Sequence, residues 1–571
     1  MPADLVVRGR IVTLDAPADP TGARAGAAGA AGATALGMWD AIAIRGARIV
    51  AVGRAEDVEP VIGPGTARLD LAPDEIALPG LTDAHLHLAD AAVASGQVDL
   101  ETAPSLAAGL ALVRSAHEDL GENDGWLRGG GWDAGRWGGW PTAADLDGVA
   151  PGRPVLLWAH DLHSVWVSAR ALSLAGMSRD TPDPPGGVIR RLVDGAPAGV
   201  LHEDATLLVT RFAPSPAGEE LADRIEAYAR RLLALGVVAV HDPGELEMDS
   251  TLERGFAAIG RLAQAGRLPI RVHAGLRRGA LDVAIARGLR SGDPLADRIG
   301  DRMGDRPDPA DGRARVGWLK LFGDGTLGSR TAALLAAYEA DPERGEPPGG
   351  PLGLLVTPPD EMAELAERAA TAGIATQIHA IGDRALRAAL DALAPTAGRT
   401  ALRPRIEHVQ LADALDLPRF AAQGIVASVQ PNHVADDAPK ARRAWGDRAE
   451  GSYPWRRLVE SGATVAFGTD APADTEDPWP GLAMAVTRRD PHWPAAAPAF
   501  APREALSLRQ ALWAACIAPA ATAGEPDRGR LSVGQRADLI VVPGAILENV
   551  DALRQARPRL VLLDGRVEYE A

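Results

Sequence analysis

The chain has 571 residues, of which 46% are hydrophobic, and a formal net charge of -17. It is long enough to bury a large core, and its acidic balance argues against nucleic acid or an anionic membrane as a partner, because both require clustered cations. A single cysteine, Cys516, excludes an internal disulfide framework and fits a reducing cytoplasm. The N-terminus alternates apolar and polar residues, unlike a secretion signal. We therefore expect a globular, cytoplasmic protein.

Both ends of the chain have the pattern of short strands joined by turns. These strands are predicted at residues 4–14, 40–53, 536–543 and 558–568. They are expected to pair into one small β domain, with residues 1–75 as its N-terminal part and 526–571 as its C-terminal part. Residues 17–37 form an alanine and glycine tract with too little side-chain area to pack, so this tract is predicted to be a loop without chemistry.

The middle of the chain, residues 76–525, alternates short apolar runs with helical patterns, as βα units do. Eight such runs lie at residues 76–88, 236–244, 269–276, 316–325, 374–382, 404–410, 424–433 and 463–472. Eight parallel strands with intervening helices predict an α/β fold, a (β/α)₈ TIM barrel whose functional groups lie at the C-terminal ends of the strands. The gap after the first run is too long for one helix, so residues 96–235 are predicted to form an inserted subdomain.

Six polar side chains decorate the predicted strand ends. In AHLHL, His85 and His87 point to the same face because side chains alternate along a strand. An HxH pair alone is a weak signal, since buried histidines are often satisfied by backbone partners. The barrel, however, brings further groups to the same mouth, namely Lys320, His379, His408 and Asp470. As a set these residues predict a metal site.

Lys320 is one of only two lysines, with Lys440, in a chain that otherwise uses arginine. Burial penalises the ammonium form, and a neutral amine can add carbon dioxide to become an anionic carbamate, which arginine cannot do. A carbamate has two oxygens that can bridge two divalent cations. The alternative is a lysine paired with a carboxylate, for which Asp324 is the nearest in sequence.

These residues carry a family resemblance. PGLTDAHLHL, Lys320, His379, His408 and Asp470 resemble the binuclear metal site, with a carboxylated lysine, of the amidohydrolase superfamily. GGGWDAGRW, KLFGDGTLGSRTAAL, QIHAIGDRA, RIEHVQ and ASVQPNHVADD resemble amidohydrolase family 3 more narrowly, the group that includes N-substituted formamide deformylase. The resemblance runs from about residue 4 to 569 and implies a distorted (β/α)₈ barrel with a urease-like β-sandwich formed by both termini.

The resemblance also implies roles. His85 and His87 would hold the more buried of two divalent metals together with Asp470, and His379 and His408 would hold the more exposed one. N6-carboxylysine at Lys320 would bridge the two. Zinc is the default metal for histidine and carboxylate ligands. A bridging hydroxide would attack the carbonyl of a small-molecule, non-peptide amide, with Asp470 as general base and acid.

Alternatives remain open within and beyond this chemistry. The same metal centre can cleave lactones, cyclic amides or imines, so the bond type rests on the resemblance. A catalytically silent binding barrel is disfavoured because all six expected positions are filled. A homodimer is left open. Further residues are predicted to bind substrate: Trp132, Asp133, His163, His241, Asp324, Arg330, Gln430 and His433. The alternatives are packing of the insertion onto the barrel for the tryptophan cluster, a structural role for His163 and loop capping for Arg330.

Overall fold

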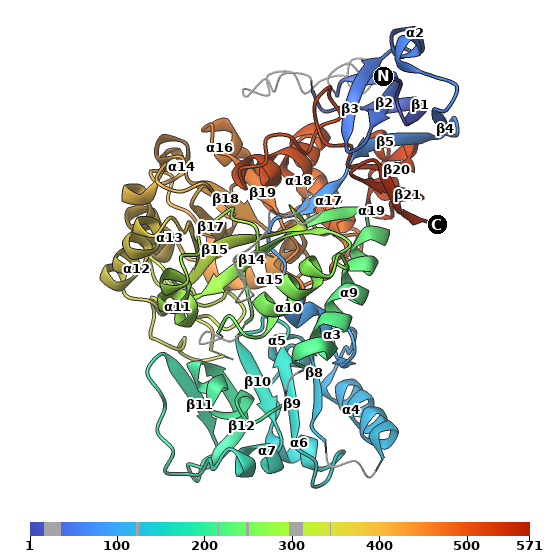
Figure 1. Cartoon of the computed structure of the whole chain (residues 1–571). Coiled ribbons are helices and arrows are strands. Elements are labelled where there is room, and N and C mark those ends of the chain that lie inside the picture. The colour runs from blue at the N-terminus through green and yellow to red at the C-terminus, as the bar shows by residue number, and fades with distance from the viewer. Residues whose placement is uncertain (16–35, 122–124, 215, 247–250, 296–311, 343) are drawn as a thin grey trace.

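The computed structural model describes residues 1–15, 36–121, 125–214, 216–246, 251–295, 312–342 and 344–571. Three sheets organise the chain (Figure 1). The loop predicted at residues 17–37 lies, except for its last two residues, outside the described residues. None of the described helices is long and apolar enough to cross a lipid bilayer.

The two termini build one sheet, with strand order β22-β21-β20-β5-β1-β2-β3, and β4 pairs with β1. Its members are β1 (Leu5–Val12), β2 (Met38–Arg45), β3 (Arg48–Gly53), β4 (Ala67–Asp70), β5 (Glu75–Pro79), β20 (Leu539–Pro543), β21 (Leu560–Leu563) and β22 (Arg566–Glu570). Alternation along β2 buries Ile42 and Ile44 in one apolar cluster with Leu539 and Leu560. Residues from opposite ends of the chain therefore share one core.

The central sheet is a parallel barrel with strand order β19-β18-β17-β16-β15-β14-β13-β6. Its strands are β6 (Leu81–Asp83), β13 (Val237–Asp242), β14 (Arg271–Arg277), β15 (Ala314–Phe322), β16 (Thr376–Ala380), β17 (Arg405–His408), β18 (Val426–Val429) and β19 (Val465–Phe467). Backbone hydrogen bonds from Ala84 to Phe467 and from Asp470 to His85, of 2.8 and 2.7 Å, join its first and last strand ends. The barrel prediction is confirmed.

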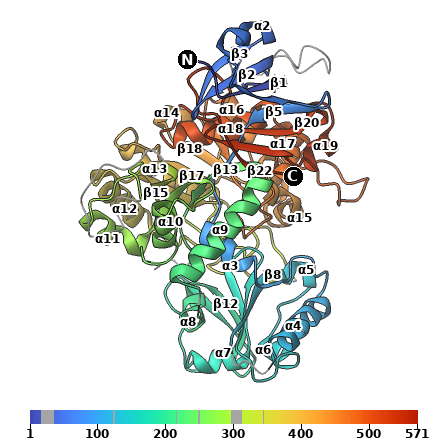
Figure 2. The same ribbon diagram turned by 45° about the vertical axis from the view of Figure 1, so that its right-hand side comes forward.

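Helices surround this barrel (Figure 2). They include α9 (Gly218–Ala234), α10 (Gly255–Gln264), α12 (Pro359–Thr371), α13 (Asp383–Leu393), α14 (Leu417–Gln423), α15 (Val434–Trp445), α16 (Trp455–Glu460), α17 (Pro478–Thr487) and α18 (Leu508–Thr522). In α13, buried Ala385, Leu386, Ala389 and Leu390 recur at helical spacing and face the strands. The apolar core under the helices is continuous around the barrel.

The run at residues 76–88, predicted as one strand, is two short strands in two sheets. β5 joins the terminal sheet, whereas β6 opens the barrel. The chain crosses between them at Gly80, where a Cβ would lie only 2.6 Å from Val238. All residues from Ile76 to Asp83 are buried. Hydrophobic pattern alone therefore carried no signal for the change of sheet.

An inserted subdomain lies between the first and second barrel strands, on the side of the barrel away from the terminal sheet (Figure 1). The chain enters it after α3 (Leu88–Ala94) and leaves through α9. Its sheet has the order β11-β12-β10-β9-β8-β7. The strands are β7 (Val98–Asp99), β8 (Leu127–Trp132), β9 (Val155–Ala159), β10 (Ser164–Val167), β11 (Gly187–Arg191) and β12 (Pro197–Glu203), with α4 (Leu106–Leu120), α5 (Ala134–Trp137), α6 (Ala143–Asp147) and α7 (Ala169–Leu174) beside them.

Candidate metal centre

The HxH pair follows β6 directly and is held there by backbone contacts. Asp83 accepts hydrogen bonds from the backbone N–H of His85 (3.0 Å) and from Thr469 Oγ (2.6 Å), which ties the first strand end to the last. Nδ1 of His87 donates to the carbonyl of Gly244 at 2.7 Å. The two rings lie 5.5 Å apart between centroids. Their Nε2 atoms are therefore left to face the pocket.

Lys320 lies inside the barrel on β15. Alternation along this strand sends Trp318, Lys320 and Phe322 to the interior, and Lys320 is only 1% exposed. Its Nζ lies 3.4 Å from Nε2 of His85 and forms no ion pair with a described carboxylate, so the predicted alternative of pairing with Asp324 is not found. Burial lowers the pKa of Lys320 to about 7. A neutral amine is thus accessible near neutral pH.

The remaining three groups close the mouth. His379 ends β16, and its ring lies 4.4 Å from that of His408, which ends β17. Asp470 follows β19. His408 and Asp470 both have left-handed backbones, with φ of 74° and 64°, conformations that non-glycine residues hold only when the surroundings enforce them. Burial keeps the pKa of both His379 and His408 well below the ordinary value, so both rings are uncharged and suited to act as metal ligands.

The arrangement of donor atoms fits metal ions. Nδ1 of His87 donates to a carbonyl and Nδ1 of His85 lies 2.8 Å from Glu407, so Nε2 of each ring points inward. These nitrogens lie 3.5 and 3.3 Å from Oδ1 of Asp470. Imidazole nitrogens and a carboxylate oxygen that converge in this way are the donor types of a divalent metal site. Ligand atoms of His85, His408 and Asp470 also lie within 4.8 Å of one another.

A buried polar layer supports these groups from below, and sequence reasoning missed it. Glu407 pairs with Arg405 at 2.7 Å and with His85, and both residues are fully buried. Burial raises the pKa of Glu407, but Arg405 and His85 outweigh it and bring the pKa to about 2. The carboxylate therefore orients the His85 ring. The buried strand RIEH carries two charged residues, but nothing in the sequence pairs Glu407 with His85.

His241 belongs to that layer and not to the pocket. It is fully buried, its Nδ1 lies 3.0 Å from Arg405, and its ring packs 5.1 Å from His273 and 5.0 Å from Trp318. The prediction that His241 contacts substrate is therefore wrong. The residue lies on β13 one step before the strand ends, which places its side chain below the mouth.

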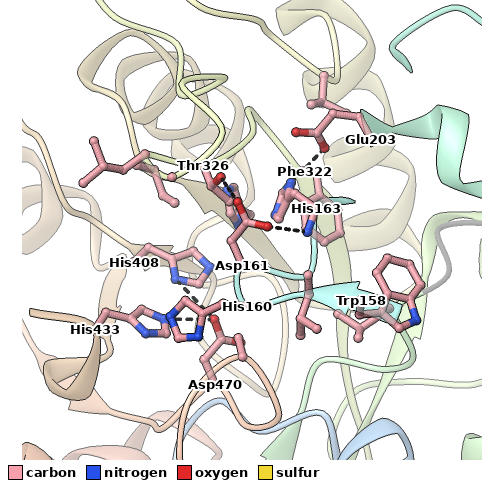
Figure 3. A pocket seen from close by; sticks show the side chains of 18 of the residues that line it. Trp158, His160, Asp161, His163, Glu203, Phe322, Thr326, His408, His433 and Asp470 are labelled. Carbon is pink, nitrogen blue, oxygen red and sulfur yellow. Dashed lines mark hydrogen bonds and ion pairs between the residues drawn. The ribbon is translucent and has the colours of Figure 1, made fainter. Parts of the chain in front are cut away.

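The pocket above the six groups has walls from both the barrel and the inserted subdomain (Figure 3). His408, His433 and Asp470 lie on one side, and His163 with Glu203 lies on another. His433 bonds Asp470 at 3.1 Å and Asp474 at 3.2 Å. Of the eight residues predicted to bind substrate, only His163 and His433 line the pocket. Its other lining residues from the subdomain include Trp158, His160, Asp161, Leu162, Glu203 and Leu207.

Two predicted contacts are instead packing and capping residues of the subdomain. Trp132 is 1% exposed, donates its indole N–H to the carbonyl of Leu157 and packs against the rings of Trp137, Trp140 and Trp166. Trp132 therefore packs inside the subdomain, and not between the subdomain and the barrel. Asp133 caps α5 through the backbone N–H groups of residues 135 and 136.

Three further predictions fall on buried residues that do not line the pocket. Asp324 is buried and accepts backbone N–H bonds from Ile381, Gly382 and Ala333. Arg330 donates to the carbonyls of residues 339 and 345. Gln430 is 2% exposed and does not line the pocket.

The subdomain is joined to α15 by an ion-pair cluster at the pocket edge, which we call the rim network. Lys440 pairs with Asp133 at 2.9 Å, and Asp436 lies 3.3 Å from both Arg136 and His160. His160 also bonds Glu101 at 2.8 Å. Burial lowers the pKa of His160, but Glu101 outweighs it and raises the pKa to about 9. Both lysines of the chain thus line one pocket.

Comparison with known proteins agrees with this geometry. A family model described as "Amidohydrolase family" matches residues 72–569. The chain belongs to the amidohydrolase family. It is therefore a hydrolase, and its closed parallel barrel agrees with that family.

Relatives cover nearly the whole length of this amidohydrolase. Protein LONG AFTER FAR-RED 3 of Arabidopsis thaliana is 31% identical over 528 residues, covering 89% of this chain and 85% of the relative. N-substituted formamide deformylase of Arthrobacter pascens is 28% identical, covering 93% and 95%. The crystal structure of an uncharacterized metal-dependent hydrolase from Pyrococcus furiosus matches with a TM-score of 0.68 and 26% identity, covering 94% of this chain and 98% of that chain.

Proposed function

We propose that this amidohydrolase is metal-dependent and cleaves a non-peptide C–N bond, in an amide of the N-substituted formamide type. The donor set at the mouth supports the metal, as does the metal-dependent hydrolase with the same fold. The relationship to N-substituted formamide deformylase supports the bond type. The observation that carries the proposal is a buried lysine that forms no ion pair with a carboxylate of the described residues and shares one pocket with four metal-ligating histidine candidates and an aspartate.

Two divalent cations would be held by six side chains. His85 and His87 with Asp470 would hold the more buried ion, and His379 with His408 the more exposed one. Imidazole and carboxylate donors favour zinc. The carboxylate of Glu407 and the carbonyl of Gly244 fix the ring orientations from behind, as such partners do in metal sites.

Lys320 would complete the set as a carbamate. Its neutral Nζ attacks carbon dioxide, an N–C bond forms, and one proton leaves to water, which yields an anion with two oxygens. Burial, which lowers the pKa of Lys320 to about 7, supplies the neutral amine that this step needs. A carbamate formed here replaces an ammonium that would repel two cations.

The chemistry of the site then follows from its residues. Bound divalent cations would lower the pKa of water and polarise a carbonyl oxygen. Asp470 accepts the proton of the attacking water and returns it to the departing nitrogen. His433 holds Oδ2 of Asp470 at 3.1 Å, which fixes the carboxylate for this transfer. Apolar wall residues favour an apolar N-substituent: Trp158, Leu162, Leu207, Leu246 and Phe322.

A substrate panel tests the proposal. Zinc-loaded protein is incubated with N-substituted formamides, acylamino acids, hydantoins and lactones, and amine, acid and ring-opened products are quantified. We expect formamides with apolar N-substituents to give the highest kcat/KM. Preferred turnover of lactones or hydantoins would reassign the bond, and an inactive panel with two metals bound would contradict the amide proposal.

A further inference from the structure

An imidazole from the inserted subdomain lies beside the candidate metal centre. His163 sits on the short connection between β9 and β10 and reaches the pocket (Figure 3). Its ring centroid lies 5.5 Å from that of His379 and 6.2 Å from that of Phe322. A residue far from the barrel strands in sequence is thus brought next to the groups that would perform the chemistry.

The His163 ring is held in one orientation. Its Nδ1 lies 2.8 Å from Oε2 of Glu203, and its backbone N–H donates to Oδ1 of Asp161 at 3.1 Å. The backbone N–H of Glu203 donates in turn to the carbonyl of His163 at 2.9 Å. Among the described residues, Nε2 has no hydrogen-bond partner. One ring nitrogen is therefore anchored, and the other is left for a ligand.

Both anchoring carboxylates are themselves fixed to the barrel loop that follows β15. Oε1 of Glu203 accepts from Thr331 Oγ1 at 3.0 Å. Oδ2 of Asp161 accepts from Thr326 Oγ1 at 3.1 Å and from Ser329 Oγ at 2.7 Å. At Gly325, in the same loop, a Cβ would lie 2.7 Å from Oε1 of Glu203. Hydroxyl groups and a glycine of this loop therefore hold the two carboxylates that position His163 beside the candidate metal centre.

The backbone around the histidine is in a costly conformation. Leu162 has φ of 57°, and Glu203 has φ of 49° with ψ of -130°. Non-glycine residues keep such angles where the surrounding structure enforces them, which is frequent at ligand sites. Here both strained residues adjoin His163, one in sequence and one through its hydrogen bond. This strained backbone holds the side chain of His163 toward the pocket.

A neighbouring histidine provides the contrast. His202 precedes Glu203 on β12 and points to the other face of the strand. Its Nδ1 lies 2.7 Å from Ser164 Oγ, and its ring packs 5.0 Å from that of Trp140. No described carboxylate bonds it, and it does not line the pocket. It therefore packs inside the subdomain.

We propose that His163 is a catalytic residue contributed by the inserted subdomain, whose Nε2–H hydrogen-bonds to the acyl oxygen of the substrate, with Glu203 as its positioning residue. The inference rests on the proposed hydrolysis of an amide. Because Glu203 holds Nδ1, Nε2 is the ring nitrogen of His163 that is available to the substrate. A fixed donor aimed at an oxygen on which negative charge develops stabilises the transition state more than the ground state.

Three variants test this assignment in metal-loaded protein. His163→Gln is expected to lower kcat about 100-fold with little change in KM, because the hydrogen bond strengthens as charge develops. Glu203→Gln, which keeps an acceptor but loses the charge, is expected to lower kcat about 10-fold. His202→Gln is the matched control and should leave kcat within a factor of about three. Metal content and Tm should stay unchanged in all three, which separates the effect from misfolding.

A binding measurement decides the inference independently of turnover. Formate, whose oxygens mimic the acyl oxygen, is titrated into zinc-loaded protein by calorimetry. His163→Gln should weaken its Kd about 10-fold, which is about 1.4 kcal/mol, and His202→Gln should not. An inactive substrate panel with this formate pattern contradicts the proposed amide hydrolysis but supports the His163 contact. The assignment of His163 is overturned if an active His163→Gln variant keeps the wild-type kcat. It is also overturned if this variant keeps the wild-type formate affinity, or if the wild type does not bind formate.

Discussion

The two lysines of the chain line the same pocket in opposite electrostatic surroundings. Lys320, inside the barrel, lies 3.4 Å from Nε2 of His85, and burial lowers its pKa to about 7 although Glu407 and Asp470 act in the opposite direction. Lys440, on α15, pairs with Asp133 at 2.9 Å. Burial lowers the pKa of Lys440, but Asp133 and Asp437 outweigh it, so the pKa is raised. Lys320 can therefore lose its proton near neutral pH, whereas Lys440 stays protonated.

The histidines divide in the same way. In the barrel, burial keeps the pKa of His379 and His408 well below the ordinary value, so both rings are neutral. In the rim network, a carboxylate raises the pKa of His160. This difference in histidine pKa shows that the pocket has two parts. Its centre, in the barrel, is suited to bind metal cations, and its edge, the rim network, consists of ion pairs. Only the first should matter for metal binding, and the second should matter for how the subdomain is attached.

The largest expected effect separates the two lysines. Lys320→Ala should lower kcat about 1000-fold, equal to about 4 kcal/mol, because the bridging anion is lost. Measured kcat and metal content should both fall, and short carboxylic acids such as acetate should restore part of the activity by supplying the missing oxygens. Lys440→Ala is the control and should keep its metal. Full activity in Lys320→Ala would contradict the proposal that Lys320 carries a carbamate needed for catalysis.

A second comparison concerns two carboxylates that each bond a histidine. Glu407→Gln should weaken metal affinity about 10- to 100-fold, because it releases the ring of His85 from its orienting partner. Glu101→Gln, which acts on His160 in the rim network, should leave metal affinity unchanged. Competition with a chromophoric chelator measures both. If the two substitutions changed metal affinity equally, the proposed distinction between the metal centre and the rim network would be wrong.

The rim network should act on stability. Lys440→Ala leaves the carboxylate of Asp133, whose side chain is 14% exposed, without its cation. We expect the free energy of unfolding to fall by about 2 kcal/mol, the cost of an unpaired, largely buried charge. Chemical denaturation of the metal-loaded protein measures it. A stability equal to that of the wild type would show that the ion pair is replaced by solvent.

The smallest expected effect is a pH dependence from the same network. The pKa of His160 is raised from 6.5 to about 9, so its protonated form stabilises the fold fully below pH 6.5 and ceases to do so as the pH rises through 9. The stability difference between wild type and His160→Gln should therefore shrink by about 1 kcal/mol between pH 6 and 10. A difference that is constant or grows over this range would contradict the ion-pair assignment.

The barrel and the gathering of the six side chains were accessible from sequence. Apolar strands that end in histidine, lysine or aspartate can be recognised one by one, and parallel strands all end at one mouth. Glu407 was not accessible, because it precedes His408 and simple alternation puts the two on opposite faces. The positive φ of His408 breaks that alternation. Backbone strain of this kind leaves no mark in hydrophobic periodicity.

The subdomain's contribution to the pocket was harder still. His163 stood among the predicted residues, but its partner Glu203 is 40 positions away, and no spacing rule joins them. Trp132, in contrast, was conspicuous in a tryptophan-rich segment and turned out to be packed in the subdomain core. A pocket wall built by a separate sheet depends on how that sheet docks, which the sequence pattern of its strands does not encode.

Anomalous diffraction from crystals of the zinc-loaded protein tests the central claim most directly. We expect two peaks at the mouth, one bounded by His85, His87 and Asp470 and the other by His379 and His408, with continuous density extending Nζ of Lys320 into a carbamate between them. A mouth without anomalous signal in catalytically active crystals, or a bare Lys320 amine turned away from both ions, would contradict the account.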